Sequence, residues 1–457
     1  MRGRLLSLMV ATAVAWTIAL NSGRTLAFNL AYLLTGVLVL SYLWAWSGTR
    51  FLEIRRYTRA RRSQVGEYFE ETLEVRNTGR LGKLWLELED HSTLPHHQVS
   101  RVIHALRGRS RYRWQVRTLC QQRGYFRLGP MTLRSGDPLG LFTVQQELPA
   151  TSQVVVYPAT VDLNAFHPPI ADLAGGEALS QRTPYLTTNV AGIREYRPGD
   201  SFNRIHWLST ARTGRLMAKE FELDPSGDVW LFLDLNRQVE VAQPWEPPPV
   251  EVGIFALRVR PGARGRSPGP RRRMPELPPS TTEYGVTAVA SVARYFLGRN
   301  RAVGLVLYGG VRQVLQTDRG ERQMRKVLEM LAGIQADGTL PLYQVLLTEG
   351  IRLSRNAIIV AVSPDPDPAW VRALREMRRR GVQSVAVVLD GGTFGQERDY
   401  DELLQELRWS EIPHDVVGYG DPLQEVLGRS TPAGGIGSVP PGAMASELMS
   451  GPDGSPP

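Results

Sequence analysis

Two long apolar runs at the start of the chain form the strongest pattern in the sequence. Residues 5–23 and 26–48 contain no charged side chain, and each run is long enough to cross a hydrocarbon layer of about 30 Å as a helix. Arginines precede the first run and follow the second, and only Arg24 lies between them. The positive-inside rule then predicts a transmembrane helical hairpin over residues 1–50, with both termini in the cytoplasm. A cleaved signal peptide is the rival interpretation, but the first run lacks a clear small-residue cleavage site and the second run follows at once.

Residues 51–160 change to short segments in which apolar and polar side chains alternate. The segments 68–77 (YFEETLEVRN), 84–90 (LWLELED), 112–119 (YRWQVRTL) and 152–158 (SQVVVYP) have this period of two. Such alternation is typical of half-buried antiparallel strands, and the Asn-Thr-Gly triplet at 77–79 marks a turn. We therefore expect an all-β domain of the sandwich type.

Residues 228–428 alternate between strand-like apolar runs and helical patterns. This order indicates an α/β domain of the Rossmann type, with a mostly parallel sheet and helices on both faces. Within it, residues 243–280 are rich in Pro, Gly and Arg and predict a disordered insertion, and residues 429–457 predict a disordered tail. Residues 161–227 remain as a linking segment between the two domains.

The net charge of +9 is concentrated in two segments and changes the picture little. Residues 50–62 hold six arginines and one glutamate, and residues 258–273 hold seven arginines and no acid. We expect the first cluster to face anionic lipid headgroups and the second to be a solvated loop. Because the second cluster lacks interleaved aromatic residues, no nucleic acid is expected as a partner. The single cysteine, Cys120, excludes an intramolecular disulfide and is expected to be a buried small apolar residue.

Oxygen-bearing side chains follow the predicted strands of the α/β domain, where ligands of such sheets bind. Asp234, Asn236 and Gln238 follow the first strand, Thr339 lies in a second loop, and Ser363 and Asp365 in a third. The pattern resembles the von Willebrand factor A fold, whose metal-ion-dependent adhesion site uses Asp-x-Ser-x-Ser, then Thr, then Asp. Asp234 and Thr339 match, but Asn236 and Gln238 replace the two serines. The resemblance implies Mg²⁺ as a possible ion at a degenerate site with Asp365. A neutral, crowded donor set suits Mg²⁺ poorly, so we expect no cofactor.

The segment REYRPGDSFNRIHW, residues 194–207, has the densest chemistry of the linking segment. Together with RGYFRLGP, DPLGLF and the paired apolar runs, it resembles the bacterial membrane-anchored family catalogued as domain of unknown function 58. The candidate residues of this motif, for a structural or docking role, are Arg194, Tyr196, Arg197, Pro198, Gly199, Asp200, Arg204, Ile205, Trp207 and Arg212.

Three interpretations of this motif are open. In the first, its arginines pair with acids in a buried corner, Trp207 lies in a core, and Asp200 caps a short helix. In the second, the motif is a surface that docks a partner. In the third, Asp200, His206 and Ser209 form a catalytic site. The first is favoured, and His206 is then expected to be a hydrogen-bonded structural residue.

The resemblance also implies a function and a setting. Members of the family lie in the bacterial cell membrane and often neighbour, in genomes, a MoxR-type AAA+ ATPase and a transglutaminase-like membrane protein. The sequence has no nucleophile elbow, phosphate-binding loop or paired zinc-ligand motif. We therefore expect a multi-pass, non-enzymatic interaction or scaffold protein that partners the ATPase at the cytoplasmic face. The alternative is a membrane-associated hydrolase acting through the region of Asp200 and His206.

Overall fold

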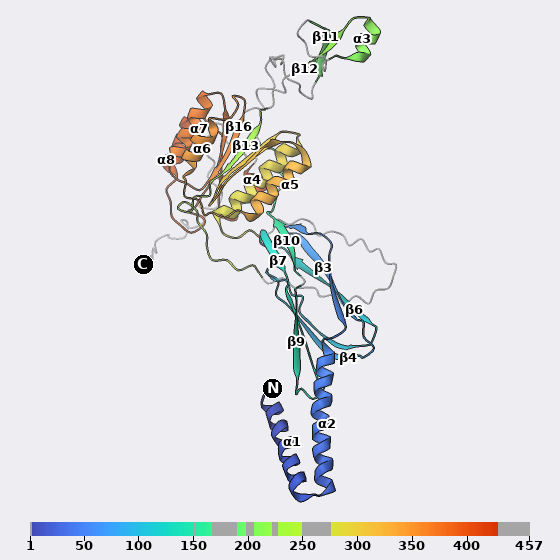
Figure 1. Cartoon of the computed structure of the whole chain (residues 1–457). Coiled ribbons are helices and arrows are strands. Elements are labelled where there is room, and N and C mark those ends of the chain that lie inside the picture. The colour runs from blue at the N-terminus through green and yellow to red at the C-terminus, as the bar shows by residue number, and fades with distance from the viewer. Residues whose placement is uncertain are drawn as a thin grey trace, which may run out of the picture. The chain divides into compact units, whose positions relative to one another are not determined.

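The computed structural model describes residues 2–149, 151–166, 190–197, 205–221, 227–248 and 276–427 (Figure 1). The chain divides into two compact units, each with its own sheets and hydrophobic core. The first unit comprises residues 1–161, 242–294 and 321–335, and the second comprises residues 162–241, 295–320 and 336–457. The predicted disordered tail and residues 249–275 of the predicted insertion lie outside the described residues.

Two helices open the first unit, α1 (Arg2–Ser22) and α2 (Thr25–Gly48). The spans 3–22 and 25–48 have mean hydropathies of 1.7 and 1.9 and are long and apolar enough to cross a membrane. The helices pack against each other, and Trp16 Nε1 donates to Thr35 Oγ1 at 3.0 Å. Gly23 adopts a positive φ of 61° in the connection, a conformation that glycine allows at no steric cost. The prediction of two apolar helices joined by a tight turn is confirmed.

Two antiparallel sheets follow, and their strands share one hydrophobic core. Leu73, Trp114, Leu86 and Leu133 are completely or almost completely buried in this core and come from both sheets. The predicted strands are confirmed, and Asn77 Oδ1 accepts a hydrogen bond from Gly79 N at 3.0 Å in the predicted turn. The first sheet has the order β1 (Leu52–Thr58), β3 (Tyr68–Asn77), β6 (Arg111–Leu119), and the second β5 (Arg101–Leu106), β4 (Lys83–Asp90), β8 (Met131–Gly136), β9 (Thr143–Leu148).

A third, three-stranded sheet also belongs to the first unit. Its central strand β10 (Ser152–Tyr157) pairs in parallel with β2 (Arg62–Gln64) and antiparallel with β7 (Gly124–Leu128). Helix α5 (Gly320–Gly333) contacts β7, where Tyr125 Oη donates a hydrogen bond to the Glu329 carbonyl at 3.0 Å. Cys120, between β6 and β7, is 1% exposed, and burial raises the pKa of its thiol. The expectation of a buried small residue is confirmed.

Helix α4 (Thr281–Gly298) follows the predicted insertion in the sequence. Ala242 and Ser280, which flank most of that insertion, form an isolated antiparallel bridge, and Gln243 N donates to the Pro279 carbonyl at 2.9 Å. The backbone at the two ends of the insertion is therefore paired.

The second unit is built on a six-stranded sheet that is parallel except at one edge. Strands buried on both faces are typical of parallel sheets, and Ile359 and Val388 are fully buried in a core with Trp370 and Leu374. The mixed α/β fold is confirmed. The strands are, in spatial order, β15 (Arg312–Asp318), β14 (Val303–Tyr308), β13 (Val229–Leu233), β16 (Ile358–Ser363), β17 (Gln383–Leu389) and β18 (His414–Val417). The helices are α6 (Leu342–Gly350), α7 (Ala369–Arg379), α8 (Asp401–Trp409) and α9 (Leu423–Val426).

Strand β15 was not predicted from the sequence. It pairs antiparallel with β14, forming a hairpin with it at the edge of the sheet. Its side chains are half-buried or exposed, so it lacks the continuous apolar run that marks the other strands.

Candidate functional site

The loop after β13 and the end of β16 meet at the carboxyl edge of the sheet. Asp234 directly follows β13 and is 2% exposed. Its Oδ1 accepts a hydrogen bond from Asn236 N at 3.0 Å, and its Oδ2 accepts one from Ser363 Oγ at 2.6 Å. The structure therefore brings together the first and third loops that the sequence singled out.

The second loop is joined to the first through its backbone. Gly338 N donates to the Leu235 carbonyl at 2.9 Å, and Arg237 N donates to the Gly338 carbonyl at 3.0 Å. A Cβ at position 338 would lie 2.3 Å from the Tyr308 carbonyl oxygen, so the close approach requires glycine. Thr339, the candidate ligand of this loop, is exposed.

The acids of these loops are partly shielded from water. Burial raises the pKa of Asp234 to about 6, and the nearby Asp365 carboxylate contributes in the same direction. Burial likewise raises the pKa of Asp365, whose backbone N donates to Ser363 Oγ at 3.0 Å. Both carboxylates thus sit where their charged forms are disfavoured.

The oxygens of these loops are engaged in hydrogen bonds that Mg²⁺ binding would have to break. Asp234 uses both oxygens for hydrogen bonds within the loops, and Asn236 Oδ1 accepts from Gln238 N at 3.1 Å. Across the part of the chain that the structure describes, no three or more His, Cys, Asp or Glu residues form a group that could hold a metal ion. An octahedral Mg²⁺ shell needs several free oxygen ligands at short distances, so these residues do not fit the ion as they are arranged.

Arg398 holds these loops together from a fourth segment, and sequence reasoning missed it. Its guanidinium donates to the carbonyls of Val239, Pro364 and Gln238. Tyr400 Oη also donates to the Pro364 carbonyl, at 2.8 Å. Both contacts go to backbone carbonyls, which every residue has, so no motif in the sequence announces them.

The motif of the linking segment forms a small hairpin of β11 (Val190–Glu195), α3 (Trp207–Thr213) and β12 (Met217–Phe221). The two strands are antiparallel, and Arg215 pairs with Glu195 at 2.8 Å. Arg194 Nη1 donates to the carbonyl of Glu195 at 2.9 Å. Tyr196 and Arg197 follow β11, and Arg212 is exposed in the last turn of α3. Pro198, Gly199, Asp200 and Arg204 lie outside the described residues.

Helix α3 departs from the expectation at its start. Its N-cap is His206, not Asp200, and the His206 side chain accepts a hydrogen bond from Ser209 N at 3.2 Å. His206 Nδ1 also lies 2.8 Å from Ser209 Oγ. The closeness of this imidazole and hydroxyl is explained by capping, in which a side chain satisfies a free N–H of the first turn. The expected hydrogen-bonded role of His206 is confirmed, and the expected Asp200 cap is wrong.

The expectation that Trp207 lies in a core is also wrong. Trp207 is 67% exposed and Leu208 is 64% exposed, and none of the residues of α3 is buried. Ile205, just before the helix, is 4% exposed and bridges Ala218 of β12 instead. A helix of two turns has a narrow contact face, and here Ile205 takes the buried position while the following two apolar residues face outward.

Several arginines of residues 50–62 form pairs within the protein, and the expected contact of this cluster with lipid headgroups stays a prediction. Arg56 is the clearest case, because its side chain is 6% exposed and lies 2.7 Å from both Glu71 and Asp90. The guanidinium of Arg50 lies over the Trp46 ring, 4.3 Å from its centroid. The other pairs are Arg55–Glu53 at 3.4 Å, Arg59–Glu70 at 3.3 Å and Arg62–Glu329 at 3.3 Å.

Two apolar helices, a β-rich unit and a mixed α/β unit define the class: a multidomain protein with a candidate membrane anchor. The family model described as "Protein of unknown function DUF58" matches residues 192–242, which hold most of the hairpin, β13 and the loop of Asp234. An uncharacterized protein, YeaD of Bacillus subtilis (strain 168), is 29% identical over 116 residues. That match covers 24% of this chain and 28% of the length of YeaD. The two matches support the DUF58 family for this chain.

Similar solved structures are distant. The CARDB domain of the PF1109 protein from Pyrococcus furiosus, in complex with di-metal ions, is 15% identical with a TM-score of 0.18, and the match covers 23% of this chain and 91% of that one. The DNA glycosylase AlkC of Pseudomonas fluorescens is 10% identical with a TM-score of 0.16, over 31% of this chain and 42% of that one. At these scores neither structure bears on the fold or function of this chain.

Proposed function

We propose that the protein is a membrane-anchored, non-enzymatic docking protein that binds a protein partner at the cytoplasmic face of a bacterial membrane. The observation that carries this proposal is the exposure of Trp207 and Leu208 on adjacent positions of α3. Large exposed apolar side chains on a polar surface are typical of interaction sites, and tryptophan is enriched among the residues that dominate binding energy. The segment that matches the DUF58 model contains both residues.

The anchor in this proposal is the pair α1 and α2. Their length and apolar composition support two membrane spans. Arginines flank the pair on both outer sides, and this supports a multi-pass hairpin with both termini in the cytoplasm. The ion pairs of Arg55, Arg56, Arg59 and Arg62 in the structure weaken the charge argument, because a paired arginine contributes less net charge at the membrane surface.

In this proposal the first unit contains a β-sandwich-like domain, and the second unit contains a von Willebrand A-like domain. The shared core of the two antiparallel sheets supports the first. The order of the six-stranded sheet and the meeting of the Asp234, Gly338 and Ser363 loops support the second. Because the side-chain oxygens of Asp234 and Asn236 already accept hydrogen bonds from N–H and O–H groups of the loops, we propose that any partner contact at this edge is independent of a metal ion.

The partner in this proposal is a MoxR-type AAA+ ATPase, with a transglutaminase-like membrane protein as a further member of the assembly. The family resemblance supports both partners. A hydrolase acting through Asp200 and His206 is the alternative. It has less support, because the His206 side chain is engaged as the cap of α3.

A binding measurement tests the proposal. The full-length protein in lipid nanodiscs is titrated with the purified MoxR-type ATPase of the same organism, with and without nucleotide. We expect the variant Trp207→Ala/Leu208→Ala to weaken binding by about tenfold or more, as for residues at the centre of an interface. Trp409→Ala is the matched control, since Trp409 is 74% exposed on another helix, and it should leave the affinity within about twofold. Absence of binding by the wild type refutes the partner, and equal losses in both variants refute the site.

A further inference from the structure

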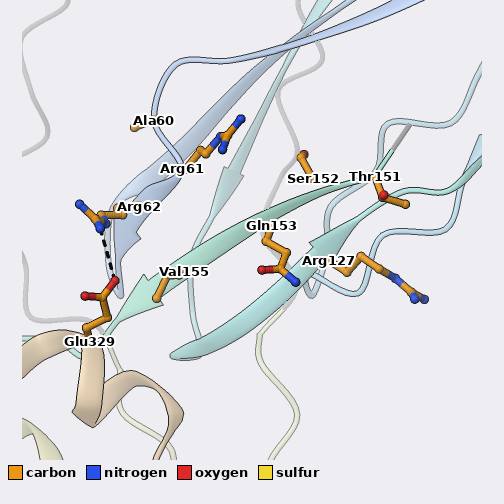
Figure 2. Close-up of a pocket in the computed structure, with 9 residues that line it drawn as sticks. All are labelled: Ala60, Arg61, Arg62, Arg127, Thr151, Ser152, Gln153, Val155 and Glu329. Carbon is orange, nitrogen blue, oxygen red and sulfur yellow. Dashed lines mark hydrogen bonds and ion pairs between the residues drawn. The ribbon is translucent and has the colours of Figure 1, made fainter. Parts of the chain in front are cut away.

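A pocket with a volume of about 810 Å³ lies on the three-stranded sheet of the first unit. Figure 2 shows the residues that line it. Arg62 comes from β2 and Arg61 directly precedes that strand, while Gln153 comes from β10, Arg127 from β7 and Glu329 from α5. Side chains alternate across a strand, and Gln153 and Arg127 are cross-strand partners on the exposed face. The pocket therefore occupies the part of that face that α5 leaves uncovered.

The polar groups of this pocket are mainly hydrogen-bond donors. Of the described lining residues, three carry guanidinium groups and one, Glu329, is an acid, which already pairs with Arg62 at 3.3 Å. Among the described residues, the side chains of Arg61 and Arg127 have neither a hydrogen-bond nor an ion-pair partner, although both are exposed. Two unpaired cations in one hollow favour an anionic ligand.

The size, lining residues and location of the pocket limit which class of anion it could bind. Among the described residues, no aromatic side chain lines the pocket, so they offer a nucleobase no stacking surface. The volume is far above that of a single phosphate ion and lies within the range of sites for larger ligands. Helix α2 contacts β4, β8 and β9, whereas the pocket lies on β2, β10 and β7, so it is not next to the candidate membrane anchor (Figure 1). This argues against a lipid headgroup.

The pair Arg62–Glu329 shows how a carboxylate binds in this pocket. The side chain of Glu329 already forms an ion pair with one of the three guanidinium groups, that of Arg62. We propose that the pocket binds an acidic segment of a partner protein, with Asp or Glu side chains of that segment pairing with Arg61 and Arg127. The Gln153 amide supplies a further donor along the segment. This surface is separate from the Trp207 surface, and its test does not depend on the identity of the ATPase.

The test uses full-length protein in nanodiscs of neutral lipid and a fluorescein-labelled octaglutamate peptide, read by fluorescence anisotropy. We expect binding that weakens as salt is raised, because exposed charge pairs are screened. Arg61→Gln/Arg127→Gln should lower the affinity by about tenfold, as the loss of two exposed pairs predicts. Arg80→Gln/Arg107→Gln removes the same charge at two other exposed arginines and should change the affinity by less than about twofold.

A variant with the opposite effect makes the test sharper. Glu329→Gln frees Arg62 from its internal carboxylate and should strengthen peptide binding by about threefold. Octaglutamine, pyrophosphate and vesicles containing anionic lipid serve as competitors. The proposal is overturned if octaglutamate does not bind, if octaglutamine competes equally well, or if pyrophosphate or the vesicles displace the peptide more effectively than unlabelled octaglutamate. It is also overturned if the two double variants lose affinity equally.

Discussion

At the carboxyl end of β13, Asp234 is 2% exposed and both of its oxygens accept hydrogen bonds, whereas in the β11–β12 hairpin Trp207 is 67% exposed. The first region buries polar groups and satisfies them internally. The second region leaves apolar groups in water. Buried polar groups need partners to offset the loss of hydration, and exposed apolar groups lose nothing in folding and gain by binding. The polar loops therefore maintain the shape of the sheet edge, whereas the hairpin exposes the apolar side chains at which we propose that a partner binds.

Replacing Asp415 of β18 should change the free energy of unfolding more than the other substitutions below, because this residue is a buried carboxylate with incomplete hydrogen bonding. It is 5% exposed, its Oδ2 has no hydrogen-bond partner among the described residues, and burial raises its pKa to about 7. Below the unfolded pKa both states are protonated and the acid costs nothing. As pH rises toward 7 the unfolded state releases the proton first, so stability falls and stays lower above pH 7.

We therefore expect Asp415→Asn to stabilise the protein relative to the wild type at pH 8 but not at pH 4, with a difference of about 3 kcal/mol between the two pH values. Urea unfolding of the detergent-solubilised protein at both pH values measures it. The same variant effect at pH 4 and pH 8 would show that Asp415 is not a buried acid of raised pKa.

Asp234→Ala tests whether the sheet-edge loops depend on internal hydrogen bonds. The change leaves Asn236 N and Ser363 Oγ, both buried, without their acceptor. A buried donor that loses its partner costs about 2 kcal/mol of unfolding free energy. Asp234→Asn keeps one acceptor oxygen and should lose less. If Asp234→Ala unfolds at the wild-type urea concentration, the loops do not rely on this carboxylate.

Trp207→Ala tests the other side of the comparison by its small effect on stability. A side chain that is 67% exposed packs against little, so its removal should change the free energy of unfolding by less than about 0.5 kcal/mol. Ile205→Ala is the matched variant, since Ile205 is 4% exposed two positions earlier, and it should destabilise the hairpin more. Limited proteolysis of the hairpin measures both. Faster cleavage of Trp207→Ala than of Ile205→Ala contradicts the exposed position of the tryptophan.

Adding Mg²⁺ should produce the smallest effect of all, because we expect no binding of the ion at the sheet edge. Asp234, Asn236 and Ser363 already use their side chains within the loops, so we expect no stoichiometric heat when the protein is titrated with Mg²⁺ or Mn²⁺ in a calorimeter. A micromolar, one-to-one heat signal that disappears in Asp234→Ala would show that the loops rearrange around an ion.

The sequence alone determined the local elements and one part of the candidate site. Periodicity is a property of neighbouring residues, so β3, β4, β6 and β10 of the first unit, the parallel strands of the second and the two apolar helices are predicted at nearly their observed positions. The other strands of the first unit are not predicted. The rule that parallel strands end at one edge also predicted that Asp234 and the region of Ser363 meet. Both inferences rest on repeating backbone geometry.

Only the tertiary structure decided which side chains are paired and which are exposed. The charge pattern predicts that Arg56 faces lipid headgroups together with its sequence neighbours, yet its side chain is 6% exposed and pairs with Glu71 and Asp90 of other strands. The favoured interpretation of the motif predicts Trp207 in a core, yet its side chain is 67% exposed on the seven-residue helix α3. Arg398 binds backbone carbonyls that carry no sequence signature. The pairing and exposure of a side chain depend on contacts between segments that are distant in the sequence. The local pattern of apolar and polar residues does not specify which distant segments will be in contact.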